Sequence, residues 1–113
     1  MSKRKWKLFV EDILESIELI ENYIANMEIE DFKKDRRTID AVVRNLEIIG
    51  EASRNIPDDI KGAYQEVDWK GMIGLRNRIA HEYFGVSLTI VWSIIKQELP
   101  PLKKQMKKII EKN

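Results

Sequence analysis

The 113-residue sequence predicts a single all-α domain over residues 1–113, a bundle of four main helices with one short helix. Apolar side chains recur at spacings of three and four along most of the chain, as they do on amphipathic helices. No segment shows the strict alternation of a strand, and no repeat or flexible linker divides the sequence. A charged fraction of 35% suits a small bundle with a thin core and a densely charged surface.

The first half of the sequence predicts two long helices joined by a polar connection at residues 31–37. Acidic residues separate the members of the first apolar stripe, which are Trp6, Phe9, Val10, Ile13, Ile17, Ile20, Ile24 and Met27. The second stripe contains Ile39, Val42, Val43, Leu46, Ile49, Ser53 and Ile56. Gly50 lies within this stripe and costs about 1 kcal/mol relative to alanine. It indicates either a tolerated cost or another helix that crosses closely at that point.

A short helix and then a third main helix are predicted next. Pro57 ends the preceding helix or begins the short one, which continues for one or two turns. Asp68 is a candidate N-cap for a helix from Trp69 to about Tyr83, and Gly85 is its stop signal. The apolar positions of this helix that fit the core are Met72, Ile73, Leu75 and Ile79. Met72, Ile73 and Ile79 fit a subunit interface equally well.

The last main helix is expected to begin after Ser87, which can cap it, and to run through residues 90–99. The pair Pro100–Pro101 should then break or kink this helix. Beyond the prolines, an apolar stripe continues among lysines, which are Lys103, Lys104, Lys107, Lys108 and Lys112. A basic face of this kind could attract RNA, although a solvated basic face is the commoner case.

Composition excludes several classes of site. The formal net charge is +1, so nucleic-acid binding would need a local basic patch or one formed by two subunits. The chain has no cysteine and one histidine, which excludes thiolate metal sites and argues against a histidine zinc site within one subunit. We therefore expect neither a metal ion nor a cofactor. The absence of a long apolar run or a secretory signal makes a cytoplasmic protein the default expectation.

The candidate functional site lies in the stretch 75–84, which holds the single histidine, His81. An arginine there can hold a phosphate, while a histidine can transfer protons near neutral pH. Asn77 and Arg78 precede His81 by four and three residues and share its helix face. Arg76 lies five residues before His81, about 140° away around an ideal helix. Arg76 therefore needs its long side chain, a local bend or a second subunit to join His81, and this geometry favours a dimer.

The chemistry that fits these residue types is RNA cleavage without a metal ion. His81 could remove the proton of the ribose 2′-hydroxyl or donate one to the 5′-oxygen, and the sequence is compatible with either role. Arg76 could stabilise the negative charge that develops on phosphorus. Structural roles are also compatible: His81 as a surface or helix-capping residue, Arg76 and Arg78 as solvated charges or partners of Glu82, and Tyr83 as a half-buried aromatic.

Three segments of the sequence resemble the HepT-like toxins of the HEPN superfamily, and the resemblance covers nearly the whole chain. Residues 40–52 are similar to the signature of the second helix of the family, and residues 69–86 to its active-site helix and the following turn. The pairs Val91–Trp92 and Leu99–Pro100 fit the final helix. The motif Arg-x4-His-x-Tyr is present through Arg76, His81 and Tyr83, without a departure in its core.

This resemblance implies a homodimeric HEPN bundle in which the Arg-His motifs of two subunits face a shared cleft. It implies an endoribonuclease toxin of a type VII toxin–antitoxin system, with tRNA among the reported substrates of the family. Carried over by motif position, Arg76 and His81 are catalytic, and Asn77 and Arg78 are supporting or substrate-binding residues. Tyr83 would accept AMP from ATP, transferred by a minimal nucleotidyltransferase antitoxin that neutralises the toxin in this way.

Two other function classes remain open at this stage, because a fold alone does not decide function. The chain could be a non-catalytic helical interaction module that binds a nucleotidyltransferase. It could also be a nucleotide-binding accessory subunit in which Arg76 and Arg78 hold phosphates. Composition and helical spacing do not distinguish these classes from a ribonuclease, which only the family resemblance favours.

Overall fold

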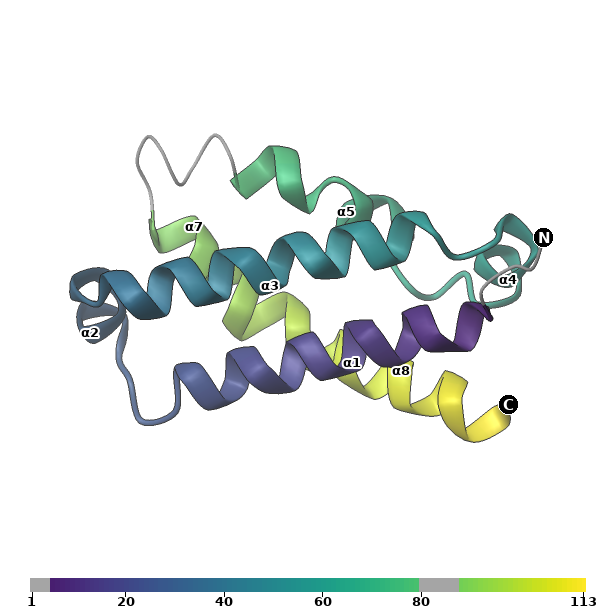
Figure 1. Ribbon diagram of the computed structural model, residues 1–113, viewed down its shortest axis with the longest axis horizontal. Coiled ribbons are helices and arrows are strands. Elements are labelled where there is room, and N and C mark those ends of the chain that lie inside the picture. The colour runs from purple at the N-terminus through teal and green to yellow at the C-terminus, as the bar shows by residue number, and fades with distance from the viewer. Residues whose placement is uncertain (1–4, 80–87) are drawn as a thin grey trace.

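The computed structural model describes residues 5–79 and 88–113, and within these ranges it contains helices and no strands (Figure 1). The elements are α1 (Trp6–Tyr23), α2 (Ile29–Lys34), α3 (Arg36–Arg54), α4 (Asp58–Ala63), α5 (Trp69–Ile73), α7 (Leu88–Ser93), the π-helix η1 (Ile94–Glu98) and α8 (Leu99–Lys112). Residues 75–79 are also helical. The prediction of an all-α fold is confirmed. Among the described helices, none is long and apolar enough to span a membrane.

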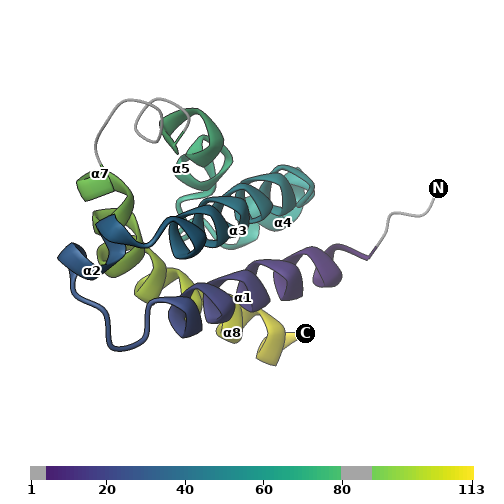
Figure 2. The same ribbon diagram turned by 60° about the vertical axis from the view of Figure 1, so that its left-hand side comes forward.

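The long helices α1 and α3 lie side by side and run in opposite directions, while the α7–η1–α8 stretch crosses behind them (Figures 1 and 2). Their apolar stripes meet in one core, to which every described helix except α4 contributes buried residues; Ile60 of α4 is partly buried and packs against this core. The predicted stripes of both helices are buried at their centres, at Val10, Ile13, Ile17, Ile20, Ile39, Val42, Val43, Leu46 and Ile49. The periodicity of three and four therefore identified the central pair of the bundle correctly.

The connection between the long helices differs from its prediction, because part of it is the helix α2. The stripe of α1 was expected to reach Met27, but α1 ends at Tyr23, and Asn26 adopts the left-handed conformation with φ 66°. Asn is one of the few residues that tolerate this conformation. The helix α2 then buries Phe32, whose ring lies 5.2 Å from that of Trp92 between centroids. A tertiary contact thus stabilises a helix that its polar sequence does not predict.

The helix α3 begins at a well-formed cap. The side chain of Asp35 accepts hydrogen bonds from the backbone N–H of Thr38 at 3.1 Å and from its hydroxyl at 2.8 Å. Such caps satisfy amide groups that lack a partner within the helix. The same hydrogen bonds from Thr38 hold the pKa of the Asp35 carboxyl below its usual value.

The proline pair, which was expected to break or kink the last helix, does not break it. The π-helix η1 precedes α8, and the two prolines lie in the first turn of α8. A proline in the first turn of a helix is tolerated, because the N–H that it lacks would have no hydrogen-bond partner within the helix. The register change in η1 therefore lets the chain stay helical through Pro100 and Pro101.

Gly50 lies where α3 and α5 cross. A Cβ atom at this position would lie 3.0 Å from the backbone carbonyl oxygen of Met72 in α5. Of the two interpretations of Gly50, the structure supports the close crossing. This approach fixes the position of α5, and with it the position of the segment that follows.

Candidate active site on segment 75–79

The site residues follow α5, whose start is anchored by Asp68. The Asp68 carboxylate accepts a hydrogen bond from the backbone N–H of Gly71 at 3.0 Å, which confirms the predicted cap. Trp69 is buried, and its indole N–H donates to the carbonyl of Tyr64 at 3.0 Å. Trp69 is therefore a core residue, and it holds the beginning of α5 against the bundle.

The predicted continuous helix from Trp69 to about Tyr83 is interrupted at Gly74. This glycine ends α5 as a turn, and its N–H bonds to the carbonyl of Lys70 at 3.0 Å. Helical structure resumes over residues 75–79, which we call the motif segment because they carry the first residues of the motif. Glycine lowers helix stability, and the break lies at a second glycine close to Gly71. The break allows the motif segment to take an orientation that differs from that of α5.

The motif segment is amphipathic. Leu75 and Ile79 are buried in the core, whereas Arg76 and Asn77 are exposed. Among the described residues, no acidic side chain forms an ion pair with Arg76. Arg76 therefore presents an accessible guanidinium group on a backbone that its buried neighbours hold in place. Such a group can bind a phosphate through paired hydrogen bonds.

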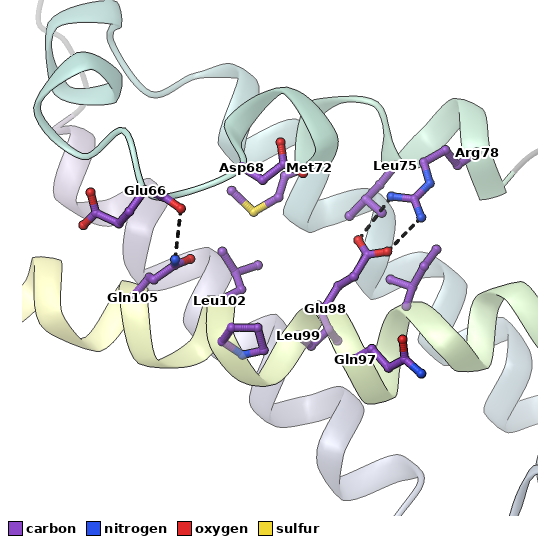
Figure 3. Close-up of a pocket in the computed structure, with 12 residues that line it drawn as sticks. Glu66, Asp68, Met72, Leu75, Arg78, Gln97, Glu98, Leu99, Leu102 and Gln105 are labelled. Carbon is purple, nitrogen blue, oxygen red and sulfur yellow. Dashed lines mark hydrogen bonds and ion pairs between the residues drawn. The ribbon is translucent and has the colours of Figure 1, made fainter.

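Arg78 instead faces the π-helix η1 (Figure 3). Its two terminal nitrogens donate to the two carboxylate oxygens of Glu98, at 3.2 and 2.9 Å. This bidentate pair raises the pKa of Arg78 through the hydrogen bonds to Glu98. The side chains of Arg78 and Glu98 are 40% and 48% exposed, so the link lies at the protein surface. In this arrangement Arg78 connects the motif segment to η1.

A pocket of about 330 Å³ separates α5 and the motif segment from η1 and α8. Its apolar wall includes Met72, Leu75 and Leu102. The ion pair Arg78–Glu98 spans one end, and a hydrogen bond of 3.1 Å from the Gln105 amide to the Glu66 carbonyl spans the other (Figure 3). The lining contains three acidic residues and one arginine, so its charge opposes the binding of a phosphate within the pocket.

The sequence-predicted residues are thus only partly placed by the structure. Arg76, Asn77 and Arg78 lie together on the motif segment. His81 and Tyr83, together with Glu82, Gly85 and Ser87, lie outside the described residues. Glu98 was not anticipated as a partner of Arg78, because twenty positions separate the two and no local pattern links them. Within residues 5–79 and 88–113, no three His, Cys, Asp or Glu side chains are grouped so that they could hold a metal ion.

Comparisons with known proteins give consistent matches. A family model described as ribonuclease HepT-like matches residues 13–109. A protein of Thermococcus cleftensis named "Probable ribonuclease HepT" is 45% identical over 107 residues, which cover 95% of this chain and 97% of the relative. A "Putative RNase" of Methanocaldococcus jannaschii is 44% identical over 111 residues, 98% of this chain and 92% of the relative. Another, from Caldanaerobacter subterraneus, is 41% identical over 104 residues, 92% and 93% of the two chains. No solved structure was found to match.

Proposed function

We propose, from the premise that this chain belongs to the HepT-like ribonuclease family and is a ribonuclease, that it cleaves RNA internally and without a metal ion. The observation that carries the proposal is the exposed Arg76 on a motif segment whose neighbours are buried. The segment is held by the Gly50 crossing on one side and by the Arg78–Glu98 pair on the other. An accessible guanidinium group on a backbone held in this way is suited to a reacting phosphate.

In the proposed reaction, the 2′-oxygen of a ribose loses its proton and attacks the neighbouring phosphorus. The bond from phosphorus to the 5′-oxygen breaks, and that oxygen gains a proton. His81 transfers one of these two protons, and a group of this kind contributes about 10²- to 10⁴-fold to the rate. Arg76 stabilises the additional negative charge on the phosphoryl oxygens. Asn77, exposed beside Arg76, supports the binding of the substrate.

We propose that the active form is a homodimer. His81 follows Arg76 by five positions, so an ideal helix would place them about 140° apart. Two copies that meet around a twofold axis bring two arginines and two histidines to one cleft. Equimolar mixing of Arg76→Ala and His81→Ala should then restore part of the cleavage activity in the mixed dimers. A fully inactive mixture of folded, exchanging subunits would contradict a shared cleft.

The biological role that we propose is that of a toxin in a type VII toxin–antitoxin system, with tRNA as substrate and a minimal nucleotidyltransferase as antitoxin. The antitoxin would transfer AMP from ATP to the Tyr83 hydroxyl and release pyrophosphate. Tyr83 follows His81 by two residues, so the added phosphate and bulk would lie close to His81. The negative charge would compete with RNA phosphates for Arg76.

Tyr83→Phe tests this form of control, because it removes only the acceptor hydroxyl. We expect the variant to cleave RNA within about threefold of wild type and to resist neutralisation by the nucleotidyltransferase with ATP. Intact-mass measurement should show AMP on the wild-type chain and none on the variant. Full silencing of Tyr83→Phe would point to inhibition by binding rather than by modification.

The proposed activity is tested with purified protein and total tRNA in EDTA, beside His81→Ala prepared identically. Mass measurement first confirms that the wild-type chain carries no AMP. Cleavage by the wild type and none by the folded variant would support the proposal. Equal cleavage by both would indicate contamination or another site. No cleavage by either would favour a non-catalytic interaction module, and binding of ATP or AMP without the transferase would favour a nucleotide-binding accessory subunit.

A further inference from the structure

The last helix, α8, separates its apolar residues from its basic ones. One side is buried against the bundle through Leu99, Leu102, Met106 and Ile109. The opposite side exposes four lysines, and we call this surface the lysine face of α8: Lys104, Lys107, Lys108 and Lys112. At about 1.5 Å per residue, the four side chains begin within roughly 12 Å of one another along the axis. A single polyanion can therefore contact several of them at once.

The charge of the lysine face is not neutralised within the described part of the chain. The fifth lysine of α8, Lys103, forms an ion pair with Glu21 of α1 at 2.8 Å. None of the other four forms an ion pair with a described acidic residue. The helix contains one acidic residue, Glu111, so its five lysines give it a net charge of +4. Four positive charges thus remain available to a partner.

The net charge of +1 conceals a marked separation of charge between two neighbouring helices. The helix α1 carries five acidic residues and one lysine, which give it a net charge of −4. It packs beside α8, and the two helices are seen together in Figures 1 and 2. Lys103 and Glu21 meet where these two helices face each other, while the lysine face points away from the core. A polyanion approaching the protein is therefore attracted to the α8 side and repelled by the α1 side.

We propose that the lysine face of α8 is an RNA-docking surface that binds the phosphate backbone, in addition to the residues of the motif segment. The inference rests on the proposed function, because a ribonuclease must bind a polyanion of this chemistry. The position of α8 supports it: Glu98, the partner of Arg78, directly precedes this helix. Phosphate contacts of this type supply affinity and orientation without reading the base sequence.

The test compares two variants with the same change in charge. In one, the four lysines of the lysine face are replaced by glutamine: Lys104→Gln, Lys107→Gln, Lys108→Gln and Lys112→Gln. In the matched control, four lysines in other parts of the chain are replaced: Lys5→Gln, Lys33→Gln, Lys34→Gln and Lys61→Gln. Glutamine is a good helix former, so both variants should fold, which circular dichroism checks. Both are made with His81→Ala, and this parent protein is the reference.

The measured quantity is the affinity for labelled total tRNA over a series of KCl concentrations. Each lost phosphate contact should reduce the slope of log affinity against log salt by about 0.7 to 0.9. For the lysine-face variant we expect a reduction of about 2 to 3 and an affinity loss of at least tenfold at about 100 mM salt. The control variant should stay within about twofold of the parent, with a slope change below about 1.

An unchanged slope in the lysine-face variant would overturn the inference, and so would an equal loss in both variants, which would reflect net charge alone. Loss of nucleotidyltransferase binding with unchanged RNA binding would show a protein-docking surface and would also overturn it. Cleavage of tRNA is measured separately, with protein that retains His81. Lysine-dependent RNA binding without any cleavage would contradict the proposed activity while supporting this surface, and cleavage with an unchanged slope would do the reverse.

Discussion

Gly50→Ala is the substitution whose consequence the structure specifies most closely. The added methyl group would lie 3.0 Å from the Met72 carbonyl oxygen, 3.8 Å from that of Ile73 and 3.9 Å from the Leu75 Cβ atom. The first contact is too short for a carbon and an oxygen to pack without a shift. The carbonyl belongs to the backbone, so relief of this contact requires the backbone of α5 at Met72 to shift by a few tenths of an ångström. The substitution therefore tests whether the close crossing positions the motif segment.

Two opposing contributions determine the size of the effect. Alanine stabilises a helix interior by about 1 kcal/mol relative to glycine. Overpacking in a well-packed contact costs about 1 to 3 kcal/mol. We therefore expect Gly50→Ala to lower the free energy of unfolding by up to about 2 kcal/mol, in spite of the better helix propensity.

Gly62→Ala is the matched control, since Gly62 lies in α4 and a Cβ atom there would have no neighbour within 4 Å. It should raise the free energy of unfolding by about 0.5 to 1 kcal/mol. Urea unfolding of both variants, with equal m-values, measures the difference. We also expect Gly50→Ala to reduce RNA cleavage and Gly62→Ala to leave it unchanged. A stabilised Gly50→Ala, equal to Gly62→Ala, would refute the close crossing as a constraint.

Three further predictions concern the elements around the site. Asp35→Ala should lower the unfolding temperature at neutral pH. The folded-state pKa of Asp35 is lowered, so its stabilisation is present above the ordinary value of 3.8 and fades as the pH falls through the folded-state pKa. Thermal unfolding should therefore show the unfolding temperatures of wild type and variant converging in acid. Glu98→Gln should reduce RNA cleavage severalfold but change the free energy of unfolding by less than about 1 kcal/mol, because the Arg78–Glu98 pair is half-exposed. Asp40→Asn, in the exposed Arg36–Asp40 pair, is its control. Equal activities of the two variants would exclude a positioning role for Glu98. Phe32→Ala should cost about 3 to 5 kcal/mol and alter the near-ultraviolet circular dichroism of Trp92, and a loss below about 1 kcal/mol would contradict the packing of α2 on that ring.

The periodic elements could be predicted because their signals are local. The stripes of α1 and α3 repeat over several turns, and Asp68 precedes a helix whose amide group it caps. Their burial faces follow from a spacing that the sequence displays directly. For these elements, tertiary packing and local propensity favour the same structure.

The remaining features depend on contacts between distant residues and leave no local signal. The helix α2 is short and polar, and its buried contact comes from Trp92, sixty positions later. The Arg78–Glu98 pair joins the motif segment to the π-helix η1, and no local sequence pattern indicates the pair or the π-helix. Gly50 was compatible with two interpretations until the Met72 carbonyl was placed beside it. Of the candidate site, the sequence predicted Arg76 as a phosphate ligand but did not predict the contacts that hold its backbone.

The central claim, that Arg76 acts on the reacting phosphate, is tested most directly by initial rates of tRNA cleavage in EDTA for wild type, Arg76→Ala and Arg54→Ala. Arg54 is a matched exposed arginine on α3 whose only described ion pair, to Glu51, is long at 4.0 Å. We predict a loss of about 10²- to 10³-fold for Arg76→Ala and a change of less than about twofold for Arg54→Ala. Equal rates for the two folded variants would contradict the account.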